Sequence, residues 1–140
     1  MNRPVRILAL GAVFGVTALA QGAKVNKLPA PYTSPGSGPE MYMAYCASCH
    51  GLKGAGDGPV AARLKTAPPD LSRLAQRHKG QFPAEQVARL IRGEAETAAH
   101  GLKDMPVWGP VFRAFNDRQE AVVQQRVASL TKHLEGLQVK

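Results

Sequence analysis

The chain's two cysteines lie three residues apart, and a histidine follows the second one directly, in the segment Cys46-Ala47-Ser48-Cys49-His50. With no further cysteine in 140 residues, a scaffold of several disulfides and an all-cysteine zinc site are both excluded. Aromatic residues make up only 6% of the chain, while 14 glycines and 11 prolines favour many loops. The length fits one domain, and that domain has little side-chain material for a core of its own.

The C-x-x-C-H spacing is typical of the covalent attachment of a c-type haem. At the end of a helix, Cys46 and Cys49 would lie on one face and could reach two vinyl groups of one porphyrin. The next residue, His50, could then place a ring nitrogen on the iron. We therefore predict one haem c, bound through both cysteines, whose porphyrin supplies the missing core.

Three other interpretations of the motif stay open at this point. A Cys46–Cys49 disulfide of the thioredoxin type needs a βαβ context, which the sequence lacks. A zinc site would need a further ligand, and the match could also be incidental. The histidines that could complete a zinc site are His78, His100 and His133.

Residues 1–20 have the pattern of a secretory signal peptide. Arg3 and Arg6 precede an apolar run, and Ala18-Leu19-Ala20 fits a signal-peptidase site. An uncleaved membrane anchor is the alternative, but the run is shorter than the ~20 residues that span a bilayer. We predict an exported, periplasmic protein. Cleavage would remove two bases and no acid, so the net charge would fall from +8 to +6.

Residues 21–37 contain Pro29, Pro31 and Pro35 among small and polar residues and show no periodicity. We predict a flexible arm, or an extended one that lies on the surface. Residues 38–140 then form the single haem domain.

Helical signals follow one another through this domain, and no alternating strand pattern is present. Ser37 and Glu40 form a capping box that opens a helix reaching about Ser48. The last helix follows a cap at Asn116, and its apolar stripe is predicted to pack against the first helix. Shorter helices are predicted over residues 59–64, 71–77 (capped by Asp70) and 84–92 (ended by Gly93). Residues 94–116, with Pro106 and Pro110, are expected to be irregular. The stripe consists of Val123, Val127, Leu130, Leu134 and Leu137.

Four segments carry a family resemblance: Tyr45 to Gly51 around the cysteines, Gly56-Asp57-Gly58-Pro59, Pro68-Pro69-Asp70-Leu71, and Met105-Pro106-Val107-Trp108-Gly109. In these segments the chain resembles the bacterial class I, monohaem cytochromes c, over roughly Gly38 to Leu137. The resemblance implies a small all-α cytochrome c-type fold, with N- and C-terminal helices packed together and loops wrapping a covalently bound haem.

The second iron ligand is assigned to Met105, so the predicted metal ligands are His50 and Met105. Met105 lies 55 residues after His50 in a loop bounded by proline and glycine, and the resemblance places the distal ligand there. His100 is the main rival, and a His/His site would have a lower potential than a His/Met site. Ordinary core filling by Met105 is a further alternative. Met41 and Met43 are expected in helix packing, and His78 and His133 at the surface.

Two further residues are assigned from the resemblance. The backbone carbonyl of Pro59 would accept the second ring N–H of His50 and raise the basicity of this ligand. Trp108 would pack at the haem edge, where its indole N–H could reach a propionate, although core packing alone explains it equally well. Arg63 is a weaker propionate candidate. Tyr42 and Tyr45 are expected to fill the contact between the first and last helices.

If protein ligands fill both axial positions, no iron position is left for a substrate. We therefore predict an electron carrier rather than an enzyme, moving single electrons between redox proteins. Two alternatives remain: a haem c subunit of a larger dehydrogenase or oxidase complex, and a peroxidase-like haem enzyme with an open distal position. A carrier of this kind is expected to be monomeric unless it joins such a complex, which could also associate with the membrane.

Positive charge gathers just after the haem motif. Over residues 53–79 six basic residues face only Asp57 and Asp70. Such a patch would steer an acidic redox partner towards the haem, although a plain solvated surface is the alternative. Nucleic acid is not an expected partner. The six bases are Lys53, Arg63, Lys65, Arg73, Arg77 and Lys79.

Overall fold

The computed structural model describes residues 30–94, 105–115 and 119–140. The predicted signal peptide, His100 and the predicted cap at Asn116 lie outside these ranges. Within them every regular element is a helix and no strand is present, which confirms the predicted all-α class. No helix in these ranges is long and apolar enough to cross a membrane. The elements are α1 (Gly38–Tyr45), α2 (Ala47–His50), the 3₁₀ turns η1 (Ala61–Arg63) and η2 (Leu71–Arg73), α3 (Leu74–Arg77), α4 (Ala84–Arg92), α5 (Trp108–Phe115) and α6 (Glu120–Gly136).

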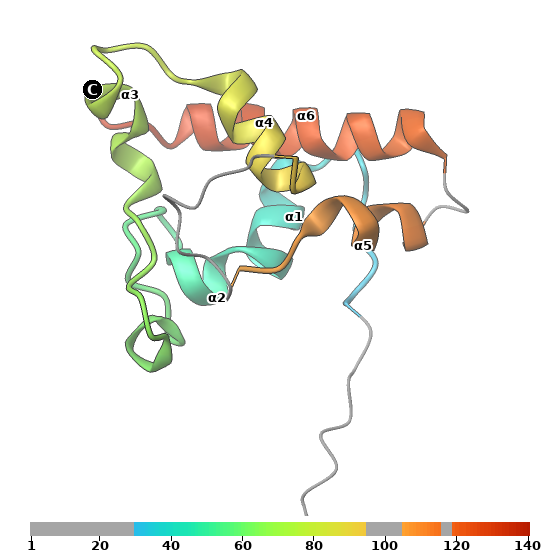
Figure 1. Ribbon diagram of the computed structural model, residues 1–140, viewed down its shortest axis with the longest axis horizontal. Helices are drawn as coiled ribbons and strands as arrows, with labels where there is room; N and C mark the ends of the chain where they lie inside the picture. The colour runs from blue at the N-terminus through green and yellow to red at the C-terminus, as the bar shows by residue number, and fades with distance from the viewer. Residues whose placement is uncertain (1–29, 95–104, 116–118) are drawn as a thin grey trace, which may run out of the picture.

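Helix α6 is the element on which the others assemble (Figure 1). Helices α1, α4 and α5 all pack against it, so the predicted contact between the first and last helices is confirmed. Its predicted apolar stripe is buried over Val123, Val127, Leu130 and Leu134. These side chains recur at three- and four-residue intervals and so share one face of the helix.

Helix α1 begins where the sequence predicts and ends earlier. The Ser37 hydroxyl accepts the backbone N–H of Glu40 at 3.3 Å, and Pro39 lies in the first turn, where a missing N–H costs nothing. The Glu40 carboxylate accepts from Ser34 N rather than closing the capping box. The helix stops at Tyr45, and Cys46 joins it to the short helix α2.

Helix α5 contradicts the prediction that residues 94–116 are irregular. Pro110 is the third residue of this helix. In the first turn of a helix the backbone N–H has no intrahelical partner, so a proline there does not break the helix. Helix α4 matches its predicted bounds and ends at Gly93, whose φ of 78° closes it in the left-handed conformation.

The described part of the N-terminal arm, residues 30–37, is an extended segment bonded to the helices. Thr33 is only 3% exposed. The Tyr45 hydroxyl lies 2.6 Å from the Pro31 carbonyl oxygen and 2.8 Å from the Thr33 hydroxyl. On the other side, the buried guanidinium of Arg126 donates to the Thr33 carbonyl. These contacts fix residues 31–33 to the helices, and the rest of the predicted arm, residues 21–29, lies outside the described residues.

The C-terminus lies against η2 and the start of α3 (Figure 1). Val139 N donates to the Ser72 carbonyl. The side-chain amide of Gln138 donates to Leu71 O and accepts from Ala75 N. Asp70 caps η2 as predicted, because its carboxylate accepts the N–H of Ser72. The short helices of this segment are thereby anchored to the end of α6.

Candidate functional site

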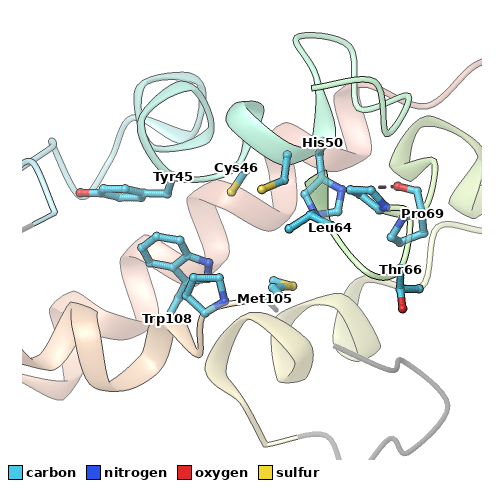
Figure 2. A pocket seen from close by; sticks show the side chains of 11 residues that line it. Tyr45, Cys46, His50, Leu64, Thr66, Pro69, Met105 and Trp108 are labelled. Carbon is cyan, nitrogen blue, oxygen red and sulfur yellow. Dashed lines mark hydrogen bonds between the residues drawn. The ribbon is translucent and has the colours of Figure 1, made fainter. Parts of the chain in front are cut away.

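Cys46 directly precedes the short helix α2 and Cys49 lies within it, and both line an apolar cavity (Figure 2). Both are free thiols in the structure. Burial, and secondarily the nearby Cys49, raise the pKa of the Cys46 thiol to about 12. Burial therefore favours the protonated thiol of Cys46 at neutral pH, in contrast to the lowered pKa of a reactive cysteine.

His50 ends α2 and is 9% exposed. Its Nδ1 lies 3.4 Å from the carbonyl oxygen of Pro69 (Figure 2). Burial lowers the pKa of His50 from 6.5, and the Pro69 carbonyl partly opposes that effect. The neutral imidazole is thus favoured, which is the form that binds a metal. The Pro69 contact involves Nδ1, which leaves Nε2 as the ring nitrogen for a metal.

In this structure the carbonyl next to Nδ1 is thus that of Pro69 and not that of Pro59, whose role beside a haem-bound His50 stays a prediction. The loop that follows α2 determines where Pro59 lies. Gly58 N donates to Cys49 O at 3.2 Å, and Val60 N donates to Ser48 O at 3.0 Å. These bonds hold the exposed Pro59 against the backbone of α2. The chain then returns ten residues later to place a second proline at the imidazole.

Two adjoining cavities, of about 240 and 40 Å³, occupy the space in front of α2. In Figure 2, Met105 and Trp108 lie on the side of the gap opposite Cys46 and His50. Cys49 and Met105 both line the smaller cavity. The cavities share the lining residues Cys46, His50, Pro69, Met105 and Trp108.

Trp108 packs in the core and also faces the cavities, while its place at a haem edge stays a prediction. It lines both cavities and is 8% exposed. Its ring lies 4.8 Å from that of Tyr45 and 5.9 Å from that of Phe112. Tyr45 therefore packs on α5 rather than on α6, against expectation. Tyr42 packs as predicted, with its ring 5.0 Å from His133 of α6, so His133 is not a free surface residue.

Tyr42 also connects the helix packing to the site. Its hydroxyl donates, at 2.6 Å, to the backbone carbonyl of Gly51, the residue that directly follows His50. Gly51 has a φ of 77°, a left-handed conformation that costs glycine little. Burial is the largest cause that raises the pKa of Tyr42 to about 12, and electrostatic interaction with Cys46 and Asp57 adds to it. The hydroxyl therefore stays protonated and keeps this hydrogen bond at neutral pH.

The lining of the larger cavity is apolar except for a few side chains. Apart from His50 and the Trp108 indole, its polar lining side chains are Arg77, His78 and Gln86, from the end of α3 and from α4. No carboxylate lines it. Arg77 and His78 are exposed, so they stand where the cavity opens to solvent. Arg63, the predicted propionate candidate, lines neither cavity.

This set of groups fits a porphyrin that carries iron and two carboxylates. Two thiols, an imidazole and a thioether surround one apolar space, and cationic or polar side chains stand only at its opening. In the described ranges no three His, Cys, Asp or Glu side chains gather as a metal site. The fold and the site thus define a small helical protein built to bind a covalent haem.

Comparison with protein families agrees with this class. A family model described as cytochrome c matches residues 36–130. The chain belongs to the cytochrome c family. A search of curated proteins and a search of solved structures found no match.

Sequence reasoning missed three residues that the structure makes prominent: Pro69, Arg77 and Arg126. Pro69 stands in one of the segments that carry the family resemblance, and Arg77 was counted only as part of a charged patch. Arg126 lies three residues after Val123 and four before Leu130, on the buried stripe of α6. Helical periodicity alone would have placed its side chain in the core.

Proposed function

We propose that this chain is an exported electron carrier in which His50 and Met105 are the two iron ligands of a haem bound through Cys46 and Cys49. The observation that supports it is that these four side chains line adjoining apolar cavities with no carboxylate in the lining. When bound, the haem supplies one-electron exchange between Fe(II) and Fe(III). Because a thioether sulfur ligand favours Fe(II), the reduction potential of the haem should be comparatively positive.

The residues of the chain act by holding and enclosing the group. The Pro69 carbonyl orients the His50 imidazole, as second-shell hydrogen bonds do for metal-bound histidines. Leu130 and Leu134 of α6 and Val87 and Ile91 of α4 exclude water from the larger cavity. With both iron positions filled by side chains, no open position remains for a peroxide or another small substrate.

The test uses protein matured with the haem-attachment machinery and two methionine variants. Met105→Ala removes the proposed ligand, and Met43→Ala is the control because Met43 is 55% exposed on α1. We expect the near-infrared thioether-to-ferric charge-transfer band in the wild type and in Met43→Ala, but not in Met105→Ala. Ferrous Met105→Ala should bind carbon monoxide rapidly, and the wild type should not.

Three outcomes would overturn the proposal. A band that persists in Met105→Ala would assign the sixth position to another residue. Rapid carbon monoxide binding by the wild type would favour a haem enzyme with an open distal position. A colourless matured sample would remove the haem itself from the argument.

The proposed redox partner has an acidic docking surface. Lys53, Arg63, Lys65, Arg73, Arg77 and Lys79 are all exposed. Arg63 and Lys65 are neighbours of Leu64 and Thr66, which line the smaller cavity, and Arg77 lines the larger one. Of the two acidic residues in this segment, Asp70 lies 3.4 Å from Arg73. Arg63, Lys65 and Arg77 thus put exposed positive charge in or next to the lining of the proposed haem site.

A further inference from the structure

The largest fully buried side chain in the described ranges belongs to a cation, Arg126 of α6, which is 0% exposed. Its Nη1 donates to the Thr33 hydroxyl at 3.0 Å, and its Nη2 donates to the Thr33 carbonyl at 2.8 Å. Nη1 also lies 3.6 Å from the sulfur of Met41. All of these partners are neutral.

Aromatic rings complete the enclosure. The guanidinium carbon lies 5.2 Å from the ring centre of Tyr32, 5.6 Å from Phe112 and 5.7 Å from Phe115. None of the three ion pairs within the described residues includes Arg126. An arginine side chain is not deprotonated in proteins. Arg126 is therefore a full positive charge, and within the part of the chain that the structure describes only dipoles and ring faces offset it.

This charge lies directly behind the wall of the haem cavity. Leu130, one helical turn after Arg126, lines the larger cavity. On another side Phe112 separates the guanidinium from Trp108, whose ring lies 5.9 Å from that of Phe112 and lines both cavities. Both Leu130 and Phe112 are buried, so the surroundings of the cation connect to the cavity lining through core side chains.

We propose that Arg126 raises the reduction potential of the haem held in this cavity. The inference rests on the electron-transfer function proposed above. Loss of one electron to a partner turns Fe(II) into Fe(III) and adds one positive charge to the site. A fixed cation in an interior of low dielectric disfavours that extra charge. Because the guanidinium is enclosed, salt screens it much less than a surface charge.

The experiment measures midpoint potentials of the haem-bound protein in four forms. Arg126→Gln removes the charge and keeps an amide that can donate to Thr33, whereas Arg126→Lys keeps the charge. Lys132→Gln is the matched control, because it removes one exposed charge from the same helix. The fourth form is the wild type.

We expect Arg126→Gln to lower the potential by more than Lys132→Gln does, and Arg126→Lys to retain most of the wild-type value. The difference between the two Gln variants should persist at high salt. A fall in Arg126→Gln no larger than in the control would overturn the proposal. An equal fall in Arg126→Lys would also overturn it, because it would assign the effect to packing rather than to charge.

Thr33→Val keeps the proposal testable if the Arg126 variants mature poorly. It removes one acceptor dipole that offsets the cation and leaves side-chain volume almost unchanged. The potential should then rise, and an unchanged or lower value would contradict the proposal. The thioether charge-transfer band of each sample, recorded first, establishes the ligand set and so separates failure here from failure of the proposed function.

Discussion

Substituting alanine for Gly38 tests how closely the first and last helices must approach. A β-carbon on Gly38 would lie 2.8 Å from the Cβ of His133 and closer still to the carbonyl oxygen of Ser129. Ser129 O is backbone of α6 and cannot swing aside, so α1 and α6 would have to move apart. Overpacking a core costs about 1–3 kcal/mol, and alanine regains at most about 1 kcal/mol of helix propensity over glycine.

The expected net loss is about 2 kcal/mol of unfolding free energy, because a backbone contact belongs at the upper end of the overpacking range. For a domain of about 100 residues this lowers Tm by about 10 °C. Urea unfolding of the haem-bound protein, followed by far-ultraviolet circular dichroism, measures the loss.

Gly36→Ala is the matched control for this substitution. Its β-carbon would lie 3.7 Å from the Gln125 amide nitrogen, an ordinary contact with a movable side chain. We expect the control to stay within about 0.5 kcal/mol of the wild type. If Gly38→Ala and Gly36→Ala unfolded at the same urea concentration, the close approach of α1 and α6 at Gly38 would not contribute to the free energy of unfolding, and the reasoning would be refuted.

Two further predictions concern charge. Burial lowers the pKa of His133 from 6.5, so the unfolded chain binds this proton more readily and stability is lost as pH falls through about 6.5. The urea midpoint should therefore drop between about pH 7 and pH 5 by more in the wild type than in His133→Asn, and equal drops would refute this. The rate of electron transfer to an acidic partner should fall with rising salt, and Lys65→Gln should slow it more than Lys132→Gln. A rate independent of salt would exclude steering by the basic patch.

The parts of the fold that were predicted correctly depend on neighbours in the chain. The stripe of α6, the Asp70 cap and the end of α4 at Gly93 are set by residues three or four positions apart, so periodicity and capping rules identify them. Helix α5 was missed because Pro110 was interpreted as a helix breaker. In fact it occupies the first turn, and whether a proline falls there depends on where the helix begins.

Within the site, the position of His50 follows from local spacing, whereas its hydrogen-bond partner, the Pro69 carbonyl, does not. The order Cys46, Cys49, His50 places the cysteines and the imidazole around one short helix. The carbonyl that faces the imidazole belongs to Pro69 because bonds from Gly58 and Val60 hold the earlier proline elsewhere. The sequence suggested only Pro59 for this contact, and the path of the loop is what brings Pro69 to the imidazole in the structure.

The sequence by itself determined the helical class and the thiol and imidazole groups, because each follows from spacing over a few residues. It also named the thioether of Met105 through the family resemblance. The tertiary structure alone decided that Met105 faces His50 across an apolar cavity and that Arg126 is enclosed behind the wall of that cavity. Arg126 bonds to Thr33 across 93 positions of the chain. Contacts of such range form only when α1, α5, α6 and the arm pack together, and no local pattern encodes them.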